Sequence, residues 1–147
     1  MARYGFGMRA TVVGTTLRAM MSLFAPASSS ARLREVGVFN TTTTALAISL
    51  VRLTNNTGVG AGQTEGEYDE DAPPPLATIF AGHTADATGG IGQTLKQASL
   101  GAAVGAGVIW TFGESGLVIQ PGTANGIGVI TPTGTGQICD LYFDWDE

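Results

Sequence analysis

The sequence has few charged side chains. Aspartate, glutamate, lysine and arginine make up 13% of its 147 residues, about half the share found in an average soluble domain. The chain is nevertheless 44% hydrophobic, which is too apolar for an intrinsically disordered segment. Its formal net charge of −5 disfavours binding to the phosphate backbone of nucleic acids, because that binding needs clustered lysine and arginine. We therefore expect one globular domain without a nucleic-acid partner.

Cysteine and histidine each occur once, as Cys139 and His83. A single cysteine cannot close an intrachain disulfide, so the chain lacks the disulfide framework of a small secreted domain. A zinc site needs several cysteine or histidine ligands. An acid–base triad needs a histidine beside a nucleophile and a carboxylate, and no motif of that kind surrounds His83. The sequence predicts a protein that is not an enzyme and has no catalytic residue, metal site or cofactor.

Long hydrophobic runs are also missing. Crossing a bilayer takes about 18 consecutive apolar residues, and the longest candidate, residues 100–112, is short and rich in glycine. Polar residues and Arg18 interrupt the apolar stretch near the N-terminus, which is not typical of a secretory signal peptide. We expect a soluble chain with no membrane partner.

Short stretches of β-branched and aromatic residues, separated by glycine and proline, are abundant and predict β-strands. Residues 45–53 carry apolar side chains on both faces, which favours a strand inside a sandwich. Residues 94–100 are compatible with one helical turn or an irregular strand. The other expected strands are residues 32–40, 76–81, 108–112, 117–120, 126–131 and 137–145. With a strand nearer the N-terminus, this pattern predicts an all-β fold, a jelly-roll or β-sandwich of about eight strands.

The last expected strand shows the clearest alternation of apolar and acidic residues. Successive side chains of a strand point to opposite faces, so Leu141, Phe143 and Trp145 should face the core. On the opposite face we expect Asp140, Asp144 and Asp146. Cys139 begins the same apolar run and is expected to be a buried, unreactive thiol.

The chain divides into two parts by composition. Residues 1–31 contain all four methionines and end in a serine-rich stretch, so they are predicted to form an N-terminal arm or a first strand. Residues 32–147 are predicted to form the β-sandwich domain. Within it, residues 54–75 combine glycines, an acidic block and three prolines, and a connection of this length without secondary structure is uncommon in a compact domain.

Charge is distributed unevenly along the chain. Residues 1–52 hold six basic residues and one acidic residue, whereas residues 53–147 hold one lysine and eleven acidic residues. Such asymmetry is compatible with attraction between subunits, although acidic loops also simply keep a protein soluble. The acidic block is a further candidate for binding a hard cation such as Ca²⁺, but it lacks the spacing of a calcium loop. The candidate partner-contact residues are Arg3, Arg9, Arg18, Glu65, Glu67, Asp69, Glu70 and Asp71.

Two regions carry a family resemblance. Residues 33–42, with the sequence LREVGVFNTT, and the following residues 46–53 resemble the early strands of small β-sandwich proteins of tailed-bacteriophage virions. Residues 117–130 and the final strand closing at Trp145 are similar to the endings of head decoration (cement) proteins and related jelly-roll virion proteins. The resemblance covers residues 32–147 and follows strand order rather than an invariant motif, so it assigns no functional residue.

This resemblance implies a phage virion structural protein that decorates and stabilises the capsid shell through oligomeric protein–protein contacts. Its partners would be the major capsid protein and further copies of itself, forming a homotrimer. The protein would be made in the host cytoplasm and lie on the capsid exterior. Two alternatives stay open: another virion β-protein associated with the tail, neck or fibre, or a carbohydrate-binding β-sandwich. The latter needs exposed aromatic side chains, whereas Trp110 and Trp145 both lie in expected core strands.

Overall fold

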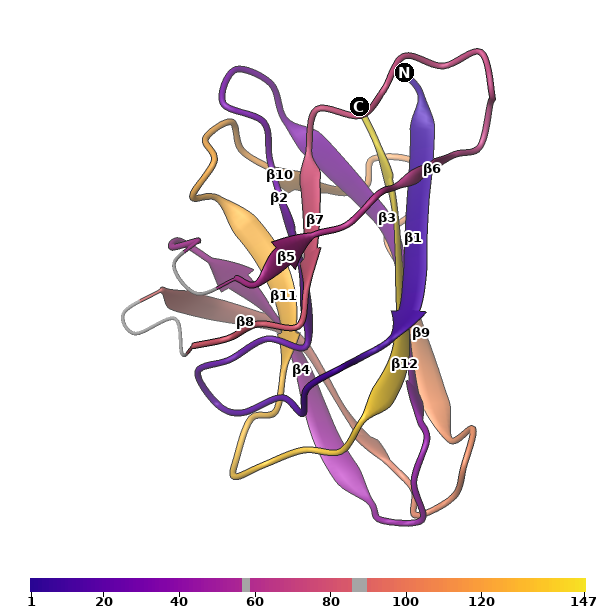
Figure 1. Cartoon of the computed structure of the whole chain (residues 1–147), viewed down its shortest axis with the longest axis vertical. Helices are drawn as coiled ribbons and strands as arrows, with labels where there is room; N and C mark the ends of the chain where they lie inside the picture. The colour runs from indigo at the N-terminus through magenta and orange to yellow at the C-terminus, as the bar shows by residue number, and fades with distance from the viewer. Residues whose placement is uncertain (57–58, 86–89) are drawn as a thin grey trace.

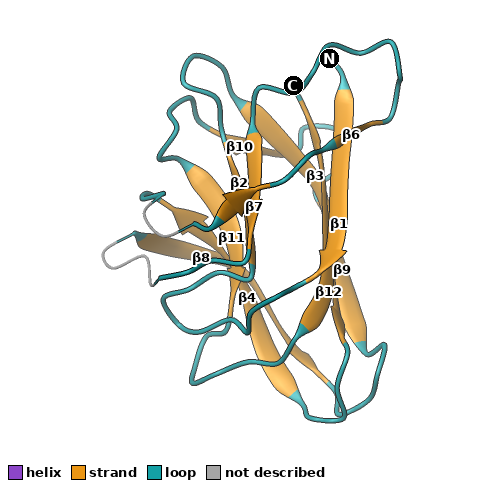
Figure 2. Cartoon of the chain, viewed as in Figure 1, coloured by secondary structure: helices purple, strands orange, loops and turns teal. Residues whose placement is uncertain are grey.

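The computed structural model describes residues 1–56, 59–85 and 90–147, and this part of the chain forms two six-stranded antiparallel sheets packed as a β-sandwich without helices. Figures 1 and 2 show the two layers, with both termini at one end of the molecule. Sheet I contains β10 (Leu117–Ile119), β3 (Ala31–Asn40), β12 (Cys139–Asp146), β1 (Arg3–Arg9) and β6 (Gly66–Glu67) in that order, with β9 (Gly107–Thr111) also paired to β3. Sheet II contains β5 (Ala61–Gly62), β7 (Thr78–Ala81), β2 (Met21–Phe24), β11 (Gly126–Ile130), β4 (Leu46–Leu53) and β8 (Ile91–Leu100). The predicted all-β sandwich is confirmed.

The described residues contain twelve strands rather than about eight. Two of the additional strands, β5 and β6, are two residues long and lie in the connection 54–75, where the chain passes the edge of each sheet. Segments this short carry no readable alternation of side chains. The third additional strand is β2. The fourth is β8, a ten-residue strand that includes residues 94–100, so of the two alternatives for these residues the strand is confirmed and the helical turn is not.

Residues 1–31 supply a strand to each sheet, so of the two predicted alternatives the structure has strands and not an arm. β1 pairs with β12 along its whole length, from Arg3 opposite Asp146 to Arg9 opposite Asp140. β2 lies between β7 and β11 in the other sheet. The physical reason is the burial of apolar side chains. Tyr4 of β1 and Met21 and Leu23 of β2 are enclosed in the common core, whereas a free arm would expose them to water.

The alternation predicted for the last strand is confirmed by β12. Leu141, Phe143 and Trp145 are buried between the sheets, and the Tyr4 and Trp145 rings lie 6.0 Å apart. Cys139 is also fully enclosed, and burial raises the pKa of its thiol to about 11, as expected of an unreactive cysteine.

A β-bulge in sheet I interrupts the alternation predicted for residues 32–40. Glu35 lies opposite Asp144, but the next pair joins Leu33 to Trp145, so Arg34 is an extra residue on β3. Leu33 therefore shares the interior with Val36 instead of sharing a face with Glu35, as its spacing predicts. A bulge of this kind redirects side chains, and here Glu35 turns to the outer face of sheet I, where it lines a groove.

Candidate functional site

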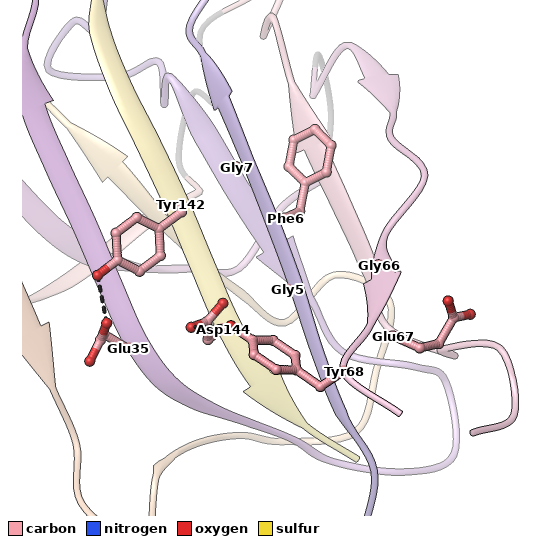
Figure 3. A pocket seen from close by; sticks show the side chains of 9 residues that line it. All are labelled: Gly5, Phe6, Gly7, Glu35, Gly66, Glu67, Tyr68, Tyr142 and Asp144. Atoms are coloured by element: carbon pink, nitrogen blue, oxygen red, sulfur yellow. Dashed lines mark hydrogen bonds between the residues drawn. The ribbon is translucent and has the colours of Figure 1, made fainter. Parts of the chain in front are cut away.

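An open groove of about 720 Å³ lies on the outer face of sheet I. We call it the tyrosine groove, because the side chains of Tyr68 and Tyr142 lie across it, Tyr142 from β12 and Tyr68 from the segment after β6 (Figure 3). The lining residues are Gly5, Phe6, Gly7, Glu35, Gly66, Glu67, Tyr68, Tyr142 and Asp144. Four distant parts of the chain thus meet on one sheet face.

Glycines form the floor of the tyrosine groove and allow the rings to lie close to the strands. Gly7 and Gly37 flank Tyr142 on the two neighbouring strands, and a Cβ at Gly37 would overlap the Tyr142 ring. A Cβ at Gly5 would lie 2.9 Å from Tyr68 Cε2, closer than real Cβ contacts allow. The absence of these side chains makes the surface hollow.

Each tyrosine hydroxyl in the tyrosine groove donates a hydrogen bond to a carboxylate. Tyr142 donates to Glu35 Oε1 at 2.5 Å (Figure 3), and Tyr68 donates to Asp144 Oδ2 at 2.9 Å. Within the described part of the chain, Glu35 Oε2 and Asp144 Oδ1 accept no hydrogen bond. Both hydroxyl protons are therefore used in hydrogen bonds within the groove, whereas the carboxylates of Glu35 and Asp144 each retain one oxygen that can accept from a further donor.

The lining of the tyrosine groove is negatively charged. Burial raises the pKa of Asp144, and the nearby charge of Glu35 adds to this, while the Tyr68 hydrogen bond and Arg3 act in the opposite direction. Burial and the hydrogen bond to Glu35 also raise the pKa of Tyr142 well above its usual range. The described lining residues include three acidic side chains and no basic one.

The predicted contact arginines Arg3 and Arg9 are paired within sheet I. Arg3 Nε donates to Asp146 Oδ1 at 3.0 Å. Arg9 makes two hydrogen bonds to Asp140, at 2.8 and 3.0 Å. Arg18 lies in the connection between β1 and β2, and its charge acts on His83. The tertiary structure thus gives Arg3 and Arg9 partners within the same chain.

The five acidic residues of the block 65–71 do not converge on one point. Glu65 accepts a hydrogen bond from the Ile79 backbone N–H at 3.3 Å, and Asp69 accepts one from the Asp71 N–H at 3.1 Å. Glu70 is exposed in the same turn. The remaining acid, Glu67, lies on β6 at the rim of the tyrosine groove. Among the residues that the structure describes, no three histidine, cysteine, aspartate or glutamate side chains are grouped to hold a metal ion.

Sequence reasoning did not single out Tyr68, Tyr142 or Glu35 as site residues. Tyr68 stands inside the acidic block, where the charges dominate the pattern, and Tyr142 stands in a strand whose alternation accounts for it as an ordinary outward residue. One local signal does exist: Gly5 and Gly7 are separated by one residue in β1, so one face of that strand carries no side chain there.

His83 is enclosed in the protein, although its sequence context is typical of an exposed loop. It follows β7 and is only 2% exposed, and its Nε2 shares a hydrogen bond of 2.8 Å with Ser22 Oγ in β2. Burial, together with the charge of Arg18, lowers the pKa of His83 to about 4. The ring is therefore neutral at pH 7 and serves as a buried polar link between a strand and a loop.

The loops at one end of the sandwich contain no charged residue. Three loops meet there, residues 41–45, 101–106 and 132–138, opposite the chain termini (Figure 1). Asn40 links two of them by donating from Nδ2 to Thr44 O and Gly101 O, and the Thr41 hydroxyl donates to Ile138 O in the third. Its exposed residues include Thr43, Thr44, Ala45, Ala102, Ala103 and Val104, the last 69% exposed. We call this surface the uncharged end.

The chain matches no protein-family model, and neither a curated protein nor a solved structure shows significant similarity to it. The described residues contain no helix that is long and apolar enough to cross a membrane. The candidate sites therefore rest on the geometry of this chain alone.

Proposed function

We propose that this protein is a non-enzymatic structural protein of a tailed-bacteriophage virion that decorates and stabilises the capsid shell. It acts on the capsid exterior through contacts with the major capsid protein and between its own copies, which associate as a trimer. Two observations agree with this proposal: residues 33–53 and 117–145 resemble those of head decoration proteins, and the chain has the all-β sandwich that this resemblance implies.

The observation that carries the proposal is the uncharged end. Protein–protein interfaces are depleted in charged residues at their centres, and the three loops of the uncharged end contain none. Val104 and its alanine neighbours present apolar surface to water there. Burying such a surface against another protein is favourable because it removes apolar groups from water.

The opposite end complements this arrangement. The loop after β6 passes near the chain termini (Figure 1), and it contains the exposed acids Glu70 and Asp71. In the proposed orientation the uncharged end docks on the shell and on neighbouring copies, while the acidic loop faces solvent. Charge on the outward surface favours solubility of the decorated particle.

The test uses purified protein and phage capsids that lack their decoration protein. We expect binding at micromolar protein concentration, a higher disruption temperature of the capsids, density at the outer shell in electron micrographs, and a trimeric mass by sedimentation. Val104→Lys places a charge in the uncharged end and should abolish binding. Leu76→Lys is the matched control, because Leu76 is equally exposed, at 67% against 69%, but lies near the termini, where Glu147 accepts its N–H.

Three results would contradict the proposal. Failure of the unaltered protein to bind capsids would exclude the decorating role. Density at the tail, neck or fibre instead of the shell would assign the protein to another virion position. Equal binding by the Val104→Lys and Leu76→Lys proteins would exclude docking through the uncharged end.

A further inference from the structure

We infer that the tyrosine groove binds a basic side chain, the ammonium group of lysine or the guanidinium group of arginine, presented by a partner protein. The inference does not depend on the proposed function, since the tyrosine groove lies on the face of sheet I and not at the uncharged end. It rests on hydrogen-bonding capacity, ring exposure and charge.

The side chains of the tyrosine groove offer hydrogen-bond acceptors but no free donor. The hydroxyl protons of Tyr68 and Tyr142 are given to Asp144 and Glu35. What remains is the second oxygen of each carboxylate and the lone pairs of the phenols. Among charged side chains, only lysine and arginine carry donors and no acceptor, so they match a groove whose side chains accept and whose lining includes three carboxylates.

The glycine floor exposes an aromatic surface beside these oxygens. Tyr68 is 63% exposed although its ring lies close over Gly5. Tyr142 is supported on its far side by Phe39, with ring centroids 6.4 Å apart and planes inclined by 22°. A cation above a tyrosine face is attracted by the ring quadrupole, and the alkyl stem of lysine or arginine fits over a surface without Cβ atoms.

The surroundings of the tyrosine groove neutralise its negative charge only in part. Arg3, whose charge acts on Asp144, hydrogen-bonds to Asp146 instead. Glu35 and Asp144 lie directly opposite each other in the sheet, which brings two acidic groups close together. A bound cation would reduce the repulsion between the two carboxylates and could donate hydrogen bonds to their remaining oxygens without rearrangement of the side chains.

A neutral sugar is a poorer match for the same surface. Sugar hydroxyls both donate and accept hydrogen bonds, and the side chains of the tyrosine groove leave the accepting lone pairs of a sugar without donors. A sugar would also gain nothing from the three carboxylates as charges. The two ligand classes therefore differ in the salt dependence of their binding.

The experiment titrates the ¹⁵N-labelled full chain with three probes: the peptide Gly-Arg-Gly-Arg-Gly, its glutamate counterpart, and a neutral maltooligosaccharide. We expect the arginine peptide to shift the resonances of Gly5, Gly7 and Tyr142, and to bind more weakly as salt is raised. Glu35→Gln and Asp144→Asn should each weaken binding roughly two- to fivefold, the range of an exposed charge pair. Tyr68→Ala should weaken binding by a similar factor. Because the Tyr68 side chain is exposed, this substitution should leave the fold intact.

Glu70→Gln is the matched control, because Glu70 is an exposed acid three residues after Glu67 but does not line the tyrosine groove. Its binding of the arginine peptide should equal that of the unaltered protein. The inference is overturned if the arginine peptide shifts no resonance of the tyrosine groove, if the sugar shifts them instead, or if Glu70→Gln weakens binding as much as Asp144→Asn. These outcomes are separate from the capsid assay, which probes the uncharged end.

Discussion

Ser22 and His83 lie 61 residues apart in the chain and share a buried hydrogen bond of 2.8 Å between Oγ and Nε2. Ser22 is fully enclosed and His83 is 2% exposed. The pair joins β2 to the loop after β7 in the interior of the protein. A histidine in this environment is held neutral, because charging it would place an unpaired cation in a poorly solvated site.

This neutral histidine makes stability depend on pH. The pKa of His83 is about 4 in the folded protein, against 6.5 for an unperturbed histidine. Between these values the unfolded chain binds more protons, so the free energy of unfolding falls as pH drops from 6.5 towards 4. The full contribution is roughly 3 kcal/mol, present above pH 6.5 and lost below pH 4. Urea denaturation at pH 7.5, 6 and 5 measures it, and His83→Gln should flatten the profile; an unchanged slope in that variant would contradict the assignment.

Gly37→Ala should destabilise the protein, because the new methyl group would overlap the ring of Tyr142. Displacing that ring also strains its hydrogen bond to Glu35, and we expect a loss of about 1–3 kcal/mol in the free energy of unfolding. Gly66→Ala is the matched control on the same groove, since its Cβ would meet only an ordinary contact of 3.7 Å with Gly5 O. In a Tyr142→Ala background the Gly37→Ala penalty should disappear; if it persists, the ring is not its cause.

Glu147 holds the segment before β7 to the end of β12. Its carboxylate accepts hydrogen bonds from the backbone N–H groups of Leu76 and Ala77, at 2.8 and 2.9 Å, and from Trp145 Nε1 at 2.9 Å. Glu147→Ala leaves these donors without their partner and should lower the free energy of unfolding by about 1–3 kcal/mol. Thermal denaturation of this variant beside Glu70→Ala, which removes an exposed acid, separates the hydrogen bonds from the change in net charge. Equal melting temperatures for the two variants would exclude the role.

Cys139 should resist thiol reagents in the native protein. It is fully buried, and burial raises the pKa of the thiol to about 11, so both access and thiolate are lacking at neutral pH. A maleimide should label it only after urea unfolds the chain, with one label per molecule by mass spectrometry. Rapid labelling of the folded protein would show that β12 opens or that the packing around Cys139 differs.

Local sequence reasoning accounts for the elements with a clear period. β12 alternates buried apolar residues with three aspartates and Tyr142 over eight positions, and successive side chains of a strand point to opposite faces. β4 has apolar residues on both sides and lies between two neighbouring strands of sheet II. The predicted fold class followed from these patterns. The bulge at Arg34 did not, because it arises from pairing β3 with β12, a partner more than a hundred positions away.

By itself, the order of residues in this chain determined a β-sandwich with few charges and with acids gathered in one loop and at one terminus. Only the tertiary structure decided that β1 is an interior strand, that Arg3 and Arg9 are paired within their own sheet, and that Glu35 meets Tyr142 across 107 positions of sequence. The physical reason is that side-chain alternation is a local property of each strand, whereas the choice of neighbouring strand depends on contacts between distant segments. The tyrosine groove consists of such contacts, since its glycines, tyrosines and carboxylates come from segments that become neighbours only on folding.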